Sequence, residues 1–207
     1  MRITPPIGYN HTTFTKEELR EASQSIVGIV EVNRMLSAYE MAETVHQYQL
    51  RNDGTPYIWH PARVAKIIVM ELGIVDPDTV IAALLHDTLE DSDILTPEVL
   101  EYNFGARVAR HVELLTKEIR IKDGPVREKI DKEYAERLHA APVVCRIIKL
   151  ADRLDNTRCL QFNLKRNPYK YVVETTNHYL PMAEETEDLR ILYLAREIRQ
   201  AMNKFFG

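Results

Sequence analysis

Glycine is scarce in this chain, and the features that would place it in a membrane or a secretory pathway are missing. Its seven glycines leave few breaks between long stretches with helical periodicity, and no convincing stretch alternates apolar and polar residues as a half-buried strand does. No apolar run approaches the roughly 18–20 residues that are needed to cross a bilayer. The first residues also show neither the apolar core nor the cleavage site of a secretory signal. We therefore expect an all-α protein that does not span a membrane.

The chain has no excess of basic over acidic residues, and it has only two cysteines. The chain has 27 Lys and Arg against 31 Asp and Glu, so no basic excess is available to neutralise phosphates, which argues against a nucleic-acid partner. Cys145 and Cys159 form no CxxC pair, and we interpret them as free thiols in a reducing compartment, the cytoplasm. A chain of 207 residues can bury one substantial core, which predicts a single domain over residues 1–207.

The periodicity predicts a helical bundle with short connections. Thr15 and Glu18 have the spacing of a capping box at the start of the first helix. Expected helices cover about 14–27, 32–50, 61–72, 79–91, 96–105, 106–118, 126–139, 142–163 and 191–205. The basic and aromatic segment 163–171 is interpreted as a solvated connector, and the last helix as core rather than as an interface, so the oligomeric state stays open.

The sequence "ALLHDTLED", residues 83–91, ends an apolar helix in charged side chains. At about 100° per residue, His86, Asp87, Glu90 and Asp91 fall within an arc of roughly 140°. A helix end that emerges into solvent explains Asp91 but not the others, because the helix dipole disfavours carboxylates at a C-terminus and the three carboxylates repel one another. A bound cation removes both difficulties, so this segment predicts a metal site.

Two further residues are candidate ligands for that metal. His60 precedes Pro61 at a loop-to-helix junction, although a histidine at such a place most often only marks the helix entry. Asp152 lies on the apolar stripe of its helix, where a carboxylate is costly to bury without a partner. With His86 and Asp87 these two make a mixed nitrogen and oxygen set, which suits Mn, Fe, Co, Ni or Zn.

Several neighbouring side chains have a less specific interpretation. Glu90 and Asp91 are placed about one turn beyond the ligands, where a carboxylate is able to orient and deprotonate a water held by the metal. Arg146, Lys149 and Arg153 form a basic stripe that reads first as solvated surface and second as a phosphate-facing edge. His46 is interpreted as a histidine of the core near the site, and not as a ligand.

Four motifs in this order resemble a known family. They are "RNDGTPYIWHPARVA", "ALLHDTLED", "FGARVARHVELLTK" and "IIKLADRLDNTR". Together they resemble the HD-domain hydrolases of the RelA/SpoT type and, more closely, the stand-alone small alarmone hydrolases, which include the metazoan SpoT homologues. The resemblance covers about residues 33–160. It implies an all-α HD fold, one Mn²⁺, and hydrolysis of the 3′-diphosphate of (p)ppGpp to GDP or GTP and pyrophosphate.

The resemblance also implies roles for individual residues. The family's metal ligands match His60, His86, Asp87 and Asp152, and its catalytic acidic pair matches Glu90 and Asp91. Residues that would contact the nucleotide are Arg51, Asn52, Asp53 and Asn156, with Lys122 and Arg127 as further phosphate contacts that align less clearly.

This sequence departs from the family in two of these motifs, and a carboxylate at 155 is an odd choice near an anionic substrate unless it points away. The family commonly has Arg-Lys where this chain has Arg51-Asn52, and its "ADRLHNMRT" motif has a histidine where this chain has Asp155. These changes leave three hypotheses open. The first is an alarmone hydrolase, and the second is the same chemistry on another nucleotide, such as the 2′-phosphate of NADPH or a 5′-nucleotide. The third is a non-catalytic nucleotide sensor or protein partner, which the intact Glu90-Asp91 pair disfavours.

Overall fold

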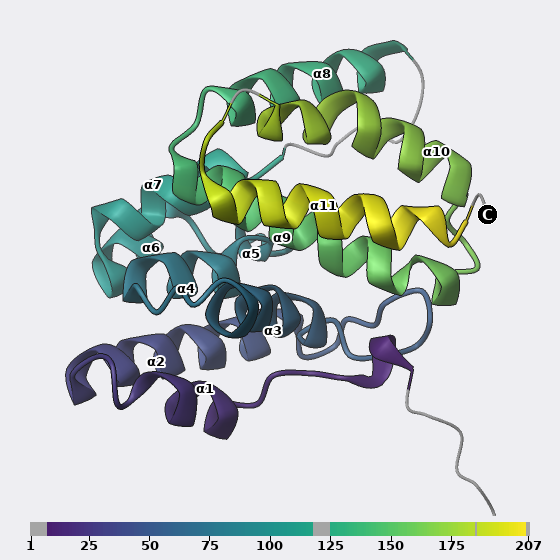
Figure 1. Ribbon diagram of the computed structural model, residues 1–207. Helices are drawn as coiled ribbons and strands as arrows, with labels where there is room; N and C mark the ends of the chain where they lie inside the picture. Colours follow the sequence, from purple (N-terminus) through teal and green to yellow (C-terminus); the bar gives the residue numbers. More distant parts are fainter. Residues whose placement is uncertain (1–7, 118–124, 185, 206–207) are drawn as a thin grey trace, which may run out of the picture.

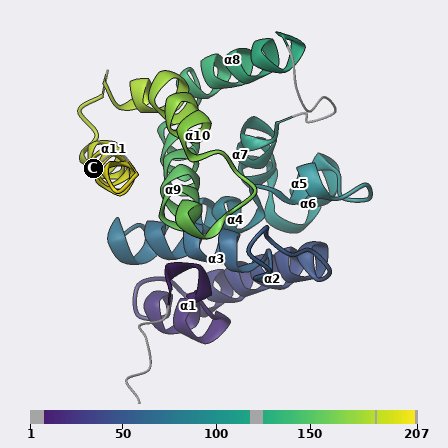
Figure 2. The same ribbon diagram turned by 90° about the vertical axis from the view of Figure 1, so that its right-hand side faces the viewer.

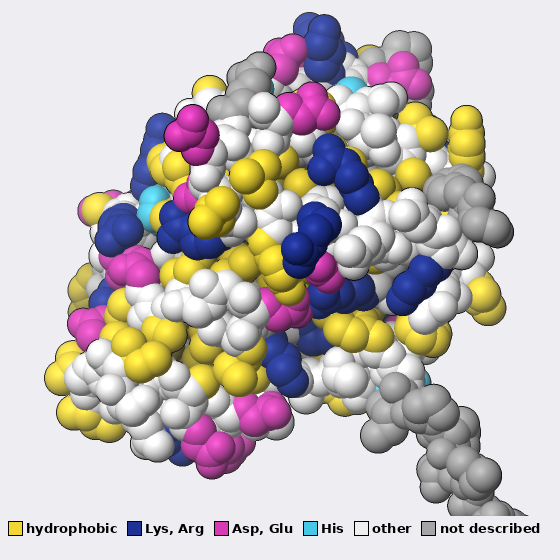
Figure 3. All heavy atoms as spheres, in the orientation of Figure 1, with side chains coloured by type: hydrophobic (Ala, Val, Ile, Leu, Met, Phe, Trp, Pro, Cys, Tyr) yellow, Lys and Arg dark blue, Asp and Glu magenta, His cyan; other side chains and the backbone are white. Residues whose placement is uncertain are grey.

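The computed structural model describes residues 8–117, 125–184 and 186–205, and every regular element in these ranges is helical (Figure 1). This confirms the predicted all-α fold. In the same ranges, no helix combines the length and the apolar character that crossing a bilayer requires. On the face shown in Figure 3, hydrophobic, basic and acidic side chains are interspersed, as on the surface of most globular proteins.

The α-helices are α1 (Lys16–Ser23), α2 (Ile29–His46), α3 (Trp59–Lys66), α4 (Pro77–Leu85), α5 (Thr88–Asp91), α6 (Pro97–Phe104), α7 (Ala106–Leu115), α8 (Pro125–His139), α9 (Val143–Cys159), α10 (Pro168–Glu174) and α11 (Leu189–Asn203). Short 3₁₀ turns cover Tyr9–His11, Leu160–Phe162 and Leu180–Ala183, and π turns extend α3 over Ile67–Glu71 and α10 over Thr175–Tyr179.

Local sequence signals explain where several helices begin and end. The predicted capping box is present at α1, because the Thr15 hydroxyl accepts from Glu18 N–H while the Glu18 carboxylate accepts from Thr15 N–H. Asp76 caps α4 by accepting from Thr79 N–H at 3.0 Å. Gly105 separates α6 from α7 with a φ of 91°, a conformation that costs glycine little.

Helix α9 lies at the centre of the bundle. Helices α3, α4 and α7 pack against it, and α11 covers it from another side (Figures 1 and 2). Helix α2 packs on α4, which is buried over all its residues from Thr79 to Leu85. A helix that is apolar all round is stable only when other elements cover every side of it. The end of α4 therefore lies in the middle of the molecule.

Two expected helix boundaries are wrong, and both concern the site. The helix predicted over 79–91 is interrupted after Leu85, where the His86 ring donates to the Ala83 carbonyl at 2.8 Å and the Thr88 hydroxyl donates to the Leu85 carbonyl at 2.7 Å. Side chains that bond back to the helix's last carbonyls compete with its own N–H groups, and the chain turns before α5 begins. The expected connector 163–171 is also partly helical, since α10 starts at Pro168.

Candidate metal centre

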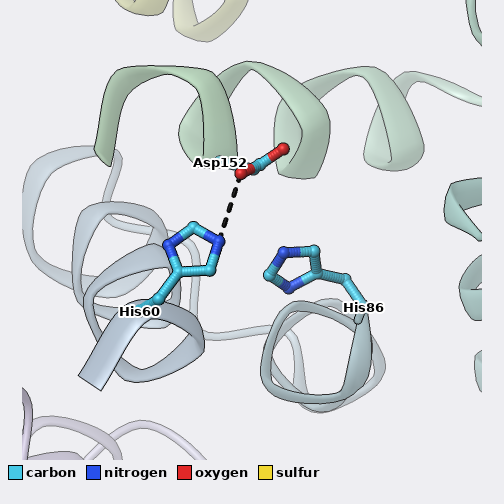
Figure 4. Close-up of side chains that lie close together, drawn as sticks. All are labelled: His60, His86 and Asp152. Atoms are coloured by element: carbon cyan, nitrogen blue, oxygen red, sulfur yellow. Dashed lines mark ion pairs between the residues drawn. The ribbon is translucent and has the colours of Figure 1, made fainter. Parts of the chain in front are cut away.

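Three predicted ligands from three different helices meet in the middle of the molecule. His60 is near the start of α3, His86 is the residue that ends α4, and Asp152 lies on α9; their ligand atoms all lie within 4.8 Å of one another. All three side chains are buried and point toward one another (Figure 4). His60 Nε2 lies 3.2 Å from Asp152 Oδ1. The fold thus gathers residues that are far apart in sequence into one small donor set.

Each histidine of this set turns one nitrogen toward the cluster and anchors the other. The Nδ1 of His86 is anchored on the Ala83 carbonyl, and its buried Nε2 has no hydrogen-bond partner. His60 holds the Asp155 carboxylate at 2.7 Å through Nδ1, which leaves Nε2 facing Asp152. A buried nitrogen without a partner is costly, whereas a metal ion uses its lone pair. Two imidazoles and a carboxylate arranged in this way fit a divalent metal.

Asp87, the fourth predicted ligand, lies beside this trio rather than within it. Its carboxylate oxygens lie 3.2 Å from His86 Nε2 and 3.6 Å from His60 Nε2, and one of them accepts from the Tyr57 hydroxyl at 2.8 Å. Burial favours the neutral acid, but the two histidines hold the pKa of Asp87 below its usual range. An ionised carboxylate at this distance is available to the same cation.

Asp152 is also kept ionised in spite of its burial. Burial alone would raise its pKa, but the Lys149 ammonium at 2.8 Å and the His60 ring hold it well below the usual range. Asn156 adds a hydrogen bond to the same carboxylate from one turn further along α9. The sequence pattern placed Asp152 on the apolar stripe, and these contacts show how its charge is stabilised there.

Glu90 and Asp91 are placed differently from what an unbroken helix predicts. Glu90 is on the wall of the pocket beside the metal centre, and its carboxylate accepts from Lys117 N–H at 2.5 Å. Asp91 is not among the residues that line this pocket, and lies 3.7 Å from the Nδ1 of His46. Burial and the nearby Asp87 charge raise the pKa of Glu90 to about 7 and that of Asp91 to about 6. Of these two residues, only Glu90 combines a raised carboxyl pKa with access to the pocket.

The pocket has a volume of about 330 Å³ and polar walls. The metal centre contributes His60, Asp87 and Asp152 to its lining. The other lining residues are Leu50, Arg51, Asn52, Tyr57, Glu90, Lys117, Lys149, Arg153, Asn156, Asn163, Arg166, Glu174 and Tyr179. Five of these are Lys or Arg, so the pocket is suited to an anionic ligand that reaches the metal centre.

Lys149 and Arg153 were first interpreted as solvated surface, and that interpretation is wrong. Their side chains are only 14% and 7% exposed. Arg153 pairs with Glu174 at 2.5 Å, and its guanidinium carbon lies 3.6 Å from the centre of the Tyr179 ring. The two cations do not lie opposite the apolar stripe either: at about 100° per residue Lys149 is about 60° and Arg153 about 100° from Asp152, and Lys149 pairs with it. The segment after α9 returns over that side of the helix and covers it. The local sequence of α9 gives no indication that this side of the helix is buried.

The residues predicted to contact a nucleotide have mixed placements. Arg51 and Asn52 line the pocket mouth; Arg51 donates to Asn156 at 2.6 Å, and Asn52 donates to Asn163 at 3.0 Å. The Asp53 carboxylate instead accepts from the backbone and hydroxyl of Thr55 and from Asn10, and it is not among the lining residues. Asp53 therefore holds its own loop together. Lys122 lies outside the described residues, and so does the side chain of Arg127.

Sequence reasoning missed several residues of the pocket. Lys117, Tyr57 and Tyr179 stood in apolar or family-like stretches without a polar signal of their own. Asn163 and Arg166 belong to the segment interpreted as a connector, whose basic and aromatic composition was the available signal. His46 is buried, its Nδ1 contacts Gln49 at 2.7 Å, and its ring centre lies 4.7 Å from that of Tyr57, as expected for a core histidine beside the site.

The chain is similar in sequence to known proteins. The family model described as "HD domain" matches residues 38–187. A guanosine-3′,5′-bis(diphosphate) 3′-pyrophosphohydrolase of Aquifex aeolicus is 39% identical over 179 residues, which make up 81% of this chain and 25% of that protein. This chain therefore spans about a quarter of that relative. The protein of the same name in Mus musculus is 42% identical over 132 residues, covering 63% of this chain and 71% of the relative.

A solved structure agrees with the sequence relatives. It is described as "A metazoan ortholog of SpoT hydrolyzes ppGpp and plays a role in starvation responses", and it is similar with a TM-score of 0.69 and 29% sequence identity. The similarity covers 81% of this chain and 94% of the other. The four motifs that suggested the RelA/SpoT-type resemblance thus lie within a larger similarity of sequence and fold. Since the family model matches most of its length, the chain belongs to the HD domain family.

Proposed function

We propose that this protein is a metal-dependent (p)ppGpp 3′-pyrophosphohydrolase, which releases pyrophosphate and leaves GDP or GTP. The proposal is carried by one observation: two members of the His60–His86–Asp152 donor set, His60 and Asp152, line a pocket that also has five cationic side chains. A guanosine polyphosphate brings several negative charges to that pocket and a diphosphate to its metal end. The relatives named as ppGpp hydrolases support the same assignment.

The metal would be held by His60, His86 and Asp152, with Asp87 beside them, and we propose Mn²⁺ as the physiological ion. A divalent ion at this place supplies Lewis acidity toward the phosphate and makes water more acidic. The mixed nitrogen and oxygen donors support Mn²⁺ among other transition metals. The half-buried Glu90 carboxyl would accept the proton of the attacking water, because its raised pKa of about 7 suits a general base near neutral pH. Asp91 lies 3.7 Å from His46 Nδ1, which contacts Gln49 at 2.7 Å, and Asp91 is therefore given no part in the proton transfer.

The cations of the pocket would neutralise the phosphates. Lys149 and Arg153 are buried close to Asp152, and Arg51 stands at the mouth, where its bond to Asn156 joins it to the metal side. Asn156 spans between Arg51 and the Asp152 carboxylate, so it is placed to hold the sugar or its phosphate. These contacts favour a ligand with phosphates along the whole pocket over a singly phosphorylated one.

A second candidate is the same hydrolysis on another phosphorylated nucleotide. The residue that favours it is Asn52, which lines the pocket at a position where the family commonly has a lysine. The Asn52 amide donates to Asn163 and brings no positive charge to the pocket. Two amides at the mouth recognise a base edge or a sugar better than they recognise a phosphate. NADPH and 5′-nucleotides are therefore the competing substrates to compare.

Release of pyrophosphate from ppGpp by the purified protein tests the proposal. We expect release with Mn²⁺ present and none after chelation, with NADPH and simple nucleotides assayed in parallel by phosphate release. An Asp152→Ala variant serves as the metal-binding control. Phosphate from another nucleotide, with no reaction on ppGpp, would replace the first candidate by the second. Metal binding without turnover on any of them would contradict both candidates.

We also propose that the protein works in the cytoplasm. Cys145 and Cys159 are both free and buried, and burial raises the pKa of their thiols to about 11 and about 12. Unpaired thiols are typical of reducing compartments. Cell fractionation of the tagged full-length protein would check this location.

A further inference from the structure

The His60 ring is held between two carboxylates of one helix. Asp152 and Asp155 lie three residues apart on α9, the spacing at which side chains share a helix face. Asp152 Oδ1 lies 3.2 Å from Nε2 of the ring, and Asp155 Oδ2 lies 2.7 Å from Nδ1. Asp155 is completely buried. It therefore points away from the pocket, behind the histidine, and does not meet an anionic substrate.

A second set of contacts fixes the Asp155 carboxylate itself. Arg63 donates to it through Nε at 2.6 Å and through Nη2 at 3.2 Å, and the Tyr9 hydroxyl donates to it at 3.1 Å. The His60 ring and the Arg63 guanidinium hold the pKa of Asp155 well below its usual range against the effect of burial. With the Arg63 and Tyr9 donors on its other side, the carboxylate is placed to accept from His60 Nδ1.

Arg63 ties this buried pair to the N-terminal segment. Its Nη1 donates to the Thr12 carbonyl at 2.8 Å and to the Asn10 carbonyl at 3.3 Å, and its guanidinium lies 5.5 Å from the centre of the Tyr9 ring. A guanidinium that is 1% exposed and bonded in this way has little freedom to move. The segment from Tyr9 to Thr12 therefore closes the back of the metal centre.

We propose that Asp155 is a positioning residue of the metal centre, and that Tyr9 and Arg63 brace it from the N-terminal segment. The Asp155 carboxylate accepts from Arg63 and Tyr9 as well, so the 2.7 Å contact makes His60 the donor at Nδ1 and leaves Nε2, the nitrogen that faces Asp152, for a metal. A carboxylate behind a ligating histidine fixes the ring's tautomer and orientation and makes it a better ligand. This role explains why a carboxylate occurs at 155, where the related motif has a histidine. The inference rests on the metal site of the proposed function and not on the identity of the nucleotide.

Metal affinity of the full-length protein tests the proposal without an activity assay. The probe is Mn²⁺ alone, in competition with a fluorescent chelator. Asp155→Asn keeps the shape of the side chain but offers an N–H₂ that favours the wrong tautomer, and we expect it to weaken Mn²⁺ binding about 10–100-fold. Tyr9→Phe removes one hydrogen bond and should weaken binding only about two- to fivefold. The matched control is Asp188→Asn, an aspartate paired with Arg190 at the start of α11, which should bind like the wild type.

The outcomes separate this proposal from the proposed function. Failure of the wild type to bind Mn²⁺ would contradict the metal site as a whole. Wild-type binding with an equal affinity in folded Asp155→Asn would overturn the role of Asp155 alone, and equal affinity in Tyr9→Phe would overturn the N-terminal brace. ¹⁵N NMR of the wild-type imidazoles adds a test that needs no variant. We expect His60 protonated at Nδ1 in the metal-free protein, and protonation at Nε2 instead would overturn the proposal.

Discussion

The two ends of the pocket are built in different ways. At the metal end, His60, His86 and Asp152 are buried and each is anchored to the fold by a second polar contact. At the mouth, Arg51 and Asn52 come from a loop and bond to side chains of other segments rather than to a core. The metal end is thus fixed by packing and the mouth by a few exchangeable side-chain contacts. We therefore expect substitutions at the metal end to impair the reaction itself, and substitutions at the mouth to change which substrate is preferred.

Removal of Asp152 should give the largest effect. Asp152→Ala deletes a ligand and also leaves the buried Lys149 ammonium without its carboxylate at 2.8 Å. We expect loss of metal binding and of activity together, and a metal-free protein that is destabilised by about 3 kcal/mol or more. Calorimetric metal titration and thermal unfolding measure the two effects. Full activity with bound metal in this variant would show that neither metal binding nor the reaction requires Asp152.

Replacement of Glu90 should separate metal binding from turnover. Glu90→Gln keeps an oxygen for the Lys117 N–H but cannot take a proton. We expect metal affinity close to that of the wild type and turnover reduced about 10²–10⁴-fold, the usual contribution of general acid–base catalysis. Asp91→Asn is the matched control, since Asp91 does not line the pocket, and it should lose less. An unchanged rate in Glu90→Gln would exclude Glu90 as the base.

The same substitution predicts a pH effect on stability. Folding raises the pKa of Glu90 from its usual 4.5 to about 7, so the folded, metal-free protein binds this proton more tightly than the unfolded chain does. Stability from this group is therefore lost as pH rises from 4.5 to 7. Above pH 7 Glu90→Gln should be more stable than the wild type, by up to about 3 kcal/mol. Near pH 4.5 the two should match. Denaturant unfolding in chelator across this range measures the difference, and parallel curves would contradict the prediction.

The metal end could be predicted from the residue pattern, whereas at the mouth only the family resemblance indicated Arg51, Asn52 and Asn156, and Asn163 and Arg166 were missed. His86 and Asp87 were conspicuous because they end an apolar helix, and Asp152 because a carboxylate on an apolar stripe needs a partner. The break between Leu85 and Thr88 was not predicted, because it depends on side-chain bonds to the last helical carbonyls. Periodicity describes one helix at a time.

Packing of distant segments against α9 explains why the environments of its charged residues were not predicted. Lys149 and Arg153 lie beside Asp152 on α9, and the return of the chain over that side, through α10 and the turns after it, buries them. Asp155 was an unexplained departure from the related motif until Arg63 and Tyr9, from two other segments, were seen around it. Long-range contacts of this kind leave no local pattern.

Substitution of Arg166, which lies at the mouth of the pocket, should have the smallest effect on catalysis. Arg166 lines the pocket from the turn that follows Asn163, the residue to which Asn52 bonds, so it stands near the place where the family's lysine is missing. We expect Arg166 to supply that cation. Arg166→Ala should then raise KM for the anionic substrate about five- to tenfold with little change in kcat, since an exposed charge contributes about 1 kcal/mol to binding.

The neighbouring residue provides a matched control for this prediction. Lys165 is an exposed cation of the same turn that does not line the pocket, and Lys165→Ala should leave KM unchanged. A lysine restored at position 52 in the Arg166→Ala background should recover part of the loss if the two cations are interchangeable. Equal KM changes for the Arg166 and Lys165 variants would mean that only the overall charge of the turn matters. Substrate choice would then have to be traced to Arg51 and Asn156, the only other predicted nucleotide contacts that line the described pocket besides Asn52.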